Sequence, residues 1–502
     1  MRALFAGLAL ALAACAPAPL PAPPLAPVVA PAPPVGTVLA GAATPDAELR
    51  YQPPSIAPGV PFTFPSRIHL DRPSGLRADL VEQHRFPVVN IIIVVNRRSY
   101  DVAEDLFLCT TFMDLAPAGG APLRAELARL GVFVNGWGCD RDALHLKLQV
   151  LPSSLGEMLG AVSGALRRGA LTPDQLKREQ ERIGRRDTKD EPQTRLRRAV
   201  AEQLFPADHP YRHITLSPNS AVQKVTVKDL DHARSRIGAA DLGLVVVGDI
   251  SAAAFGEHLD HLAASWPAKS APAARVAPGG GVPSKATRAD DKHGIFVVDE
   301  PDGREIELAL LFPVPAFDSD DSAALFMLKS ELSERMQHPP ERDKEKLWSN
   351  QETTLERSPF HDRLRIQVRV PKGRLASALP ALLAEIEGLG KKPLTDMELR
   401  DEKTDLTDWL ERRYGDNDKI LSRTEILVGL GAGRDTDTRL QQGIAALDAG
   451  KVTRAAASFL DPNKALIVAL GPVGGEKSAL EELKLGKVTV IGPAPEQKGK
   501  TR

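Results

Sequence analysis

The sequence feature that most constrains the fold is one pattern of helices and strands that occurs twice along the 502 residues. In each half a predicted helix is followed by an apolar run that reaches a glycine: 242–249 is LGLVVVGD and 466–472 is LIVALGP. Apolar runs of this length between turn residues are typical of strands buried on both faces. We therefore expect an internal duplication.

The remaining elements predict an α+β chain. Residues 76–80 and 88–95 predict two adjacent strands, one half-buried and one buried, and 142–150 alternates as a third. Helices are expected over 101–115, 122–130, 156–167, 174–205 and 256–266 of the first half and over 323–336 and 375–389 of the second, with strands at 295–298, 306–312 and 364–370.

Composition and motifs exclude several classes of protein. The formal net charge is −1, so no basic surface for nucleic acid is expected. With 43% hydrophobic and 26% charged residues, the chain is an ordinary globular protein of two to four domains. It contains no H-E-x-x-H, P-loop, dinucleotide-binding or G-x-S-x-G motif.

The N-terminus predicts a lipid anchor. Arg2 precedes an apolar run over 3–14 that is too short to span a bilayer and is typical of a signal peptide. The run ends in LAAC, which resembles a bacterial lipobox with cleavage before Cys15 and lipid on its thiol. A plain secretory signal is the alternative. Ala16 in place of aspartate resembles lipoproteins of the outer membrane, so we expect a chain anchored there that faces the periplasm.

Residues 16–45 predict a tether that follows the signal peptide of 1–15. Nine of the nineteen residues from 16 to 34 are proline, which favours an extended polyproline chain. At about 3.1 Å per residue, that stretch could reach roughly 60 Å. The globular part would then stand off the membrane surface.

The stretch 101–139 carries a resemblance to a known family. A helix with Val102, Leu106, Cys109 and Met113 on its buried face is followed by a short helix and by the strand-like VFVNGWGC. In this order the stretch resembles the first helix and strand of the pitrilysin and insulinase metallopeptidases, which include mitochondrial processing peptidase. Further family-like turns are DHPY at 208–211 and VVGD at 246–249.

The resemblance runs from about residue 66 to 474 and implies a fold. We expect two homologous α+β sandwich domains, each a mostly antiparallel sheet backed by helices, that form a clamshell. The domains would span 46–266 and 292–475. A linker rich in Pro, Ala and Gly would span 267–291, and a tail 476–502, its last residues disordered.

Active members of this family bind zinc through H-x-x-E-H, in which two imidazoles hold the ion and the Glu activates its water. The matching positions here are Leu106, Cys109 and Thr110, and the third-ligand position falls near Gly184. None of these residues is the family's ligand. The resemblance therefore implies a vestigial site with no catalytic residue, no metal and no cofactor, unless the ligands lie elsewhere.

Four residues match the family's substrate-binding positions. Asn135 and Gly136 lie on the strand that pairs with substrate backbone in active relatives, although Asn135 could instead cap a turn. Arg342 and Trp348 fall in the region that supplies an Arg and a Tyr. The resemblance therefore implies that these four residues bind peptide.

Besides Cys15, the chain has two cysteines, Cys109 and Cys139. The resemblance places them on the two elements that flank the lost site. In an oxidising compartment we expect them to form a disulfide. Two buried free thiols are the alternative.

The string EHLDH at 257–261 superficially resembles a metal site. Because Leu259 and Leu262 supply the buried side of that helix, we expect Glu257, His258, Asp260 and His261 to lie mostly on its solvated faces.

Three functions remain open. The leading hypothesis is a non-catalytic, membrane-tethered homologue that binds peptide or unfolded polypeptide, or pairs with an active zinc peptidase of the same family. An active zinc metalloendopeptidase with unrecognised ligands is the first alternative. A structural envelope lipoprotein is the second.

Overall fold

The computed structural model describes residues 62–97, 101–117, 120–140, 142–185, 192–206, 209–212, 219–266, 293–342, 345–357 and 362–491. The described residues belong to one compact unit that begins at Phe62. Cys15, the tether at 16–45 and the linker at 267–291 lie outside the described residues. No helix within the described ranges is long and apolar enough to cross a membrane.

The first half contains a six-stranded sheet with the order β1-β2-β6-β3-β5-β4. Its strands are β1 (Ile68–Asp71), β2 (Arg77–Glu82), β3 (Val89–Asn96), β4 (Phe133–Cys139), β5 (Ala143–Val150) and β6 (Leu242–Gly248). Only the β2–β6 pair is parallel. β3 is central and six of its eight residues are apolar; seven of the eight, Asn90 included, are buried.

Helical segments pack against this sheet through one apolar core. They are α1 (Val102–Glu104), η2 (Asp105–Thr110), η3 (Phe112–Asp114), α2 (Leu123–Arg129), α3 (Leu155–Arg168), α4 (Pro173–Gly184), α6 (Asn219–Val222), α7 (Val227–Arg236), η6 (Ala239–Asp241) and α8 (Ala252–Ala264). The short η4 (Pro152–Ser154) precedes α3 and buries no residue. Thr226 caps α7, since its side chain accepts the amide of Asp229.

The second half contains another six-stranded sheet with the order β11-β12-β8-β13-β7-β14. Its strands are β7 (Gly294–Asp299), β8 (Glu305–Pro313), β11 (Ser349–Arg357), β12 (Asp362–Pro371), β13 (Leu466–Gly471) and β14 (Val488–Ile491); β9 (Glu341–Arg342) and β10 (Glu345–Lys346) pair separately. Its helices are α9 (Ser322–Met336), α10 (Leu375–Lys391), α11 (Asp396–Arg412), α12 (Asn417–Gly429), α13 (Thr436–Ala445), α14 (Ala449–Phe459), η7 (Pro462–Lys464) and α15 (Lys477–Glu482).

The strand orders confirm the duplicated α+β architecture. The series β4-β5-β3-β6-β2 and β11-β12-β8-β13-β7 have the same antiparallel pairs and end in the same parallel pair. The sheets differ at the outer strand, because β1 is antiparallel to β2 and β14 is parallel to β7.

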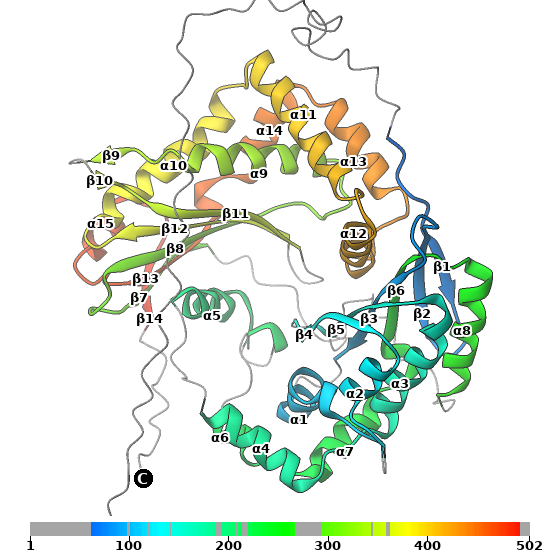
Figure 1. Ribbon diagram of the computed structural model, residues 1–502. Coiled ribbons are helices and arrows are strands. Elements are labelled where there is room, and N and C mark those ends of the chain that lie inside the picture. Colours follow the sequence, from blue (N-terminus) through cyan, green and yellow to red (C-terminus); the bar gives the residue numbers. More distant parts are fainter. Residues whose placement is uncertain are drawn as a thin grey trace, which may run out of the picture. The chain divides into compact units, whose positions relative to one another are not determined.

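Two helices belong to one half in sequence and pack on the sheet of the other. Figure 1 shows α9 and α10 on one face of the second sheet and α5 (Pro192–Leu204) on the opposite face. α5 and the segment after it, which includes η5 (Pro210–Arg212), bury Leu196, Leu204 and Tyr211 against β8 and β13. Conversely, α12 buries Ile420 and Leu421 against β2, β3 and β6.

Three predictions need correction. β2 and β3 are not adjacent, because β6 lies between them. The helix predicted over 174–205 is two helices, since α4 ends at Gly184 and α5 begins at Pro192, where proline starts a helix without losing a hydrogen bond. The tail predicted from 476 contains α15 and β14, so the second sheet extends to Ile491.

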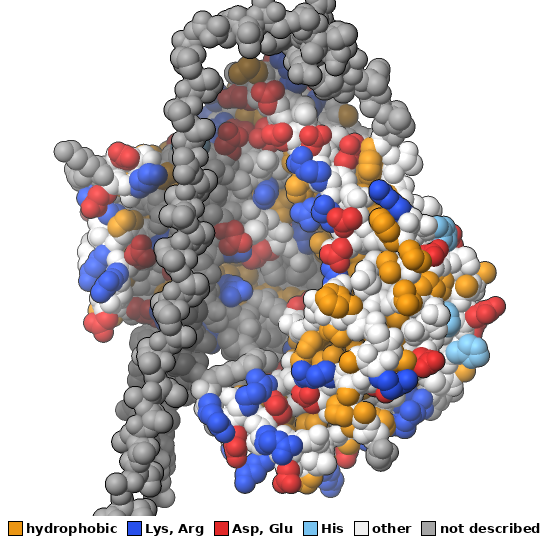
Figure 2. Space-filling model, viewed as in Figure 1, with side chains coloured by type: hydrophobic (Ala, Val, Ile, Leu, Met, Phe, Trp, Pro, Cys, Tyr) orange, Lys and Arg blue, Asp and Glu red, His pale blue; other side chains and the backbone are white. Residues whose placement is uncertain are grey.

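Acidic and basic side chains are interspersed on the face seen in Figure 2. The full sequence has nearly equal numbers of the two signs, 64 basic and 65 acidic residues, with a formal net charge of −1.

Candidate functional site

The helix that resembles the zinc-binding helix has an irregular backbone. Asp101 caps its first turn by accepting the amide of Glu104 at 2.8 Å. The next turn, η2, is a π-helix: the amide of Thr111 donates to the carbonyl of Leu106 at 3.0 Å, five residues back. The hydroxyl of Thr111 donates to the same carbonyl at 3.0 Å. The predicted single helix over 101–115 is therefore three short helical segments, and π-turns of this kind recur at functional sites.

The four predicted vestigial positions do not form a ligand set. Leu106 is 2% exposed and lies in the core. Cys109 is bonded to Cys139, and Thr110 is half-buried. Gly184 ends α4 and offers no side chain. Zinc prefers imidazole, thiolate and carboxylate ligands, so these positions do not fit the ion.

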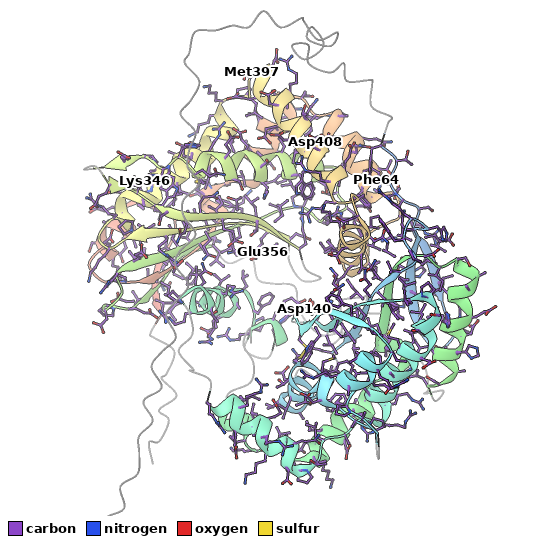
Figure 3. All side chains as sticks on the ribbon, viewed as in Figure 1. Phe64, Asp140, Lys346, Glu356, Met397 and Asp408 are labelled. Atoms are coloured by element: carbon purple, nitrogen blue, oxygen red, sulfur yellow. A yellow bond between two sulfur atoms is a disulfide. The ribbon has the colours of Figure 1, made fainter. Side chains whose placement is uncertain are left out.

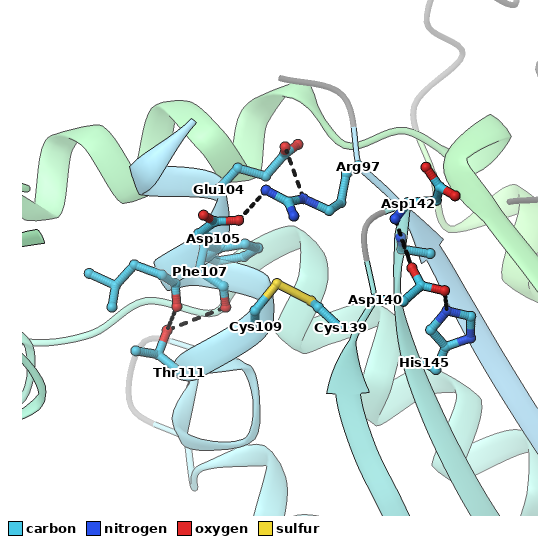
Figure 4. The surroundings of a disulfide bond; sticks show 12 residues. Arg97, Glu104, Asp105, Phe107, Cys109, Thr111, Cys139, Asp140, Asp142 and His145 are labelled. Atoms are coloured by element: carbon cyan, nitrogen blue, oxygen red, sulfur yellow. Dashed lines mark hydrogen bonds and ion pairs between the residues drawn. A yellow bond between two sulfur atoms is a disulfide. The ribbon is translucent and has the colours of Figure 1, made fainter. Parts of the chain in front are cut away.

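The disulfide predicted from the sequence is present, and the alternative of two free thiols is wrong. It joins η2 to the last residue of β4, with Cα atoms 5.3 Å apart (Figure 4). The sulfur of Cys109, at the position that the resemblance matches to the family's catalytic Glu, is therefore bonded and not a free thiol. The bond also fixes the end of β4 to the helical layer.

β4 is an edge strand of the first sheet. Asn135 lies at a β-bulge between Val134 and Gly136 and pairs with no residue of β5, so it does not cap a turn. Phe133 is 63% exposed at the start of the strand. A Cβ at Gly136 or Gly138 would meet nothing within 4 Å, so the space beside the strand is open.

A histidine between two carboxylates lies next to the turn after β4, and the sequence analysis did not indicate it. The imidazole of His145 lies 2.9 Å from Asp140 and 2.6 Å from Glu425 of α12. Burial disfavours the charged imidazole, but the bonds to both carboxylates outweigh it and raise the pKa of His145 to about 10. Figure 3 labels Asp140 in the turn between β4 and β5.

A second cluster of charged side chains, Arg97 with Glu104 and Asp105, lies at the start of η2. The guanidinium of Arg97 forms an ion pair with Asp105, and its Nε lies 3.9 Å from the carboxylate of Glu104, which is 1% exposed (Figure 4). These carboxylates therefore have a cationic partner in place.

The structure places the two predicted substrate-binding residues of the second half, Trp348 and Arg342, in different environments. Trp348 is 1% exposed, and its indole donates to the carbonyl of Met336 at 2.9 Å. The prediction that Trp348 binds peptide is therefore wrong: the side chain is part of the core. Arg342 lies in β9, which pairs with β10.

One group of three carboxylates in the described residues has the spacing to hold a metal ion: Glu331, Glu334 and Glu402, on α9 and α11. Glu331 bonds to Arg335 at 2.8 Å. Burial and the neighbouring carboxylates raise the pKa of Glu402. The arginine already supplies a cation here, so we assign no metal to this group.

Neither a family model nor a curated protein sequence matches the chain. Solved structures do match. A protease from Helicobacter pylori has a TM-score of 0.68 and 16% identity over 81% of this chain and 100% of its own. The peptidase M16 inactive domain from Pseudomonas fluorescens has 0.66 and 16% over 81% and 98%. The first half of the periplasmic protease PqqL from Escherichia coli has 0.65 and 16% over 86% and 99%.

The chain has the fold of these structures, two described as proteases and one as a peptidase M16 inactive domain. At this identity the likeness concerns the fold, and it agrees with the duplicated α+β architecture predicted from the sequence. The positions of the site residues rest on this chain's own geometry.

Proposed function

We propose that this chain is a non-catalytic member of the insulinase-type metallopeptidase family that binds extended polypeptide along β4. The observation that carries the proposal is the disulfide between Cys109 and Cys139, because the resemblance assigns the catalytic Glu of active relatives to position 109. The likeness to an M16 domain described as inactive supports it.

The edge of β4 is the surface that would hold the polypeptide. An edge strand offers backbone donors and acceptors that an added strand can pair with. The exposed ring of Phe133 would contact a side chain of that strand. Arg342 would contribute, as the resemblance implies, only if β9 approaches the same peptide.

The proposal includes a membrane tether at Cys15 and an oxidising compartment. A disulfide in the folded chain supports a location outside the cytoplasm, because disulfides persist where thiols are not kept reduced. Pairing with an active zinc peptidase of the same fold would give such a binding subunit a role in the cell envelope.

Zinc content and hydrolysis, measured together on protein purified with its disulfide intact, test the loss of catalysis. We expect no stoichiometric zinc and no cleavage of labelled, unfolded β-casein. One zinc per chain with chelator-sensitive cleavage would overturn the proposal and identify an active peptidase.

Binding of the same labelled casein tests the edge strand. Replacing the exposed ring in Phe133→Ser should weaken binding about five- to tenfold. Phe86→Ser is the matched control, because Phe86 is also exposed, at 54%, but lies between β2 and β3. Equal effects of the two substitutions, or no binding at all, would exclude β4 as the site.

A further inference from the structure

A groove of about 430 Å³ lies between α3 and α8, on elements that the proposed function does not use. It exists because three glycines of α3, at 156, 160 and 164, lie on one helical face and place no side chain there. A Cβ at Gly160 would meet nothing within 4 Å.

Four basic or imidazole side chains line this groove: Arg167 and Arg168 from the last turn of α3, and His258 and His261 from α8. No carboxylate is among the described residues that line it. Two acids on the same helices have other partners: Glu157 lies 3.5 Å from Arg129, and Asp260 pairs with Arg72. As the helical periodicity predicts, His261 is exposed, while His258 is half-buried; both also line the groove.

One of these side chains packs on an aromatic ring, and the other three lie over the groove without an ion pair to any described residue. The guanidinium of Arg167 stacks over the ring of Trp266, 5.7 Å from its centroid. Nη2 of Arg168 lies 3.2 Å from the position that a Cβ would take at Gly164. Nδ1 of His258 lies 3.1 Å from the corresponding position at Gly156. Within the described ranges, Arg168, His258 and His261 have no ion pair or side-chain hydrogen bond.

We propose that the groove between α3 and α8 binds a phosphate group. Guanidinium groups bind phosphate oxygens through paired N–H donors, and the imidazoles add further donors from the opposite wall. The two guanidinium cations would repel a metal ion bound to the two imidazoles, so the groove does not favour a metal. The phosphate could belong to a free inorganic anion or to a phospholipid headgroup.

Isothermal titration of the full chain at low salt tests the proposal with two probes. Inorganic pyrophosphate represents the free anion, and dihexanoyl phosphatidylglycerol below its critical micelle concentration represents the lipid headgroup. We expect saturable binding of at least one probe at one site per chain. Tighter binding of pyrophosphate would identify a free anion, and tighter binding of the lipid a headgroup.

Two substitutions and one control assign the binding to this groove. Arg168→Gln should weaken binding about tenfold, which corresponds to the loss of one charge-assisted bond. Gly160→Leu should abolish binding by filling the groove, while its thermal unfolding shows that the chain still folds. Arg178→Gln, at an exposed arginine of α4, should leave affinity unchanged. No saturable binding, or binding unaffected by both groove substitutions, would overturn the proposal.

Discussion

The imidazole of His145 on β5 lies 2.6 Å from the carboxylate of Glu425 on α12, although the two residues are 280 positions apart in the chain. Beside them, Lys147 pairs with Asp418 of the same helix at 2.8 Å. Polar contacts therefore flank the apolar contact of Ile420 and Leu421 with the first sheet. Together these contacts hold α12 on a sheet formed by the other half of the sequence.

Removing the imidazole should loosen α12 in a pH-dependent way. The pKa of His145 is raised from 6.5 to about 10 in the folded chain. Its stabilisation should therefore be complete below about pH 6.5 and lost as pH rises through about 10. At neutral pH, His145→Gln should lower the free energy of unfolding by on the order of 1–3 kcal/mol, measured by urea denaturation.

His232→Gln is the matched control, since His232 is an exposed histidine on α7. It should unfold as the parent chain does at every pH. The difference between His145→Gln and the parent chain should shrink between pH 7 and pH 10. A difference that stays constant over this range would show that the charged imidazole is not what stabilises the contact.

Breaking the disulfide should destabilise the fold. The bond closes a loop with a sequence separation of 30, for which loop entropy in the unfolded chain predicts a loss of about 3–4 kcal/mol. We expect the double substitution of Cys109 and Cys139 by Ser to lower the urea midpoint. The parent chain with reductant should match it, and unchanged midpoints in both would contradict the prediction.

Local patterns in the sequence predicted the strongest features of the fold. The apolar run at 242–249 is β6, and the alternation at 142–150 is β5. The position of β6 between β2 and β3 could not be predicted from such patterns, because strand order depends on long-range pairing. The π-turn at Thr111 was missed for another reason: its hydroxyl competes for a helical carbonyl.

Among the candidate sites, too, some features could be predicted from the sequence, whereas others depend on contacts between distant segments. The disulfide was predictable because both cysteines lie on elements that the resemblance places together. Helical periodicity alone predicted that His258 and His261 face solvent. The groove that they line depends on glycines about 100 residues earlier in α3, so no local pattern could indicate it.

The glycine that ends each central apolar strand should not accept a side chain. Gly248 has φ of 158°, and a Cβ there would lie 2.3 Å from the carbonyl oxygen of Val88. Gly471 in the second sheet has φ of 142° and would meet the carbonyl of Glu305 at 2.6 Å. We expect Gly248→Ala to lower the free energy of unfolding by about 1–3 kcal/mol or more.

Gly243→Ala provides the comparison within the same strand. A Cβ at Gly243 would meet Val94 at 3.9 Å, which is an ordinary contact. Thermal unfolding of the two variants should therefore differ, with Gly243→Ala close to the parent chain. Equal losses would indicate that the backbone at Gly248 relaxes without strain.

Gly160 in the middle of α3 should be a position where alanine stabilises the chain. Alanine is more favourable than glycine inside a helix by about 0.5–1 kcal/mol, and a Cβ at 160 has open space. Gly390 in α10 is the contrasting helical glycine, because a Cβ there would lie 3.2 Å from the backbone of Ala457. Urea denaturation should show a gain for Gly160→Ala and no gain or a loss for Gly390→Ala. A loss for Gly160→Ala would mean that the face of α3 along the groove is covered in solution, and that the groove is closed there.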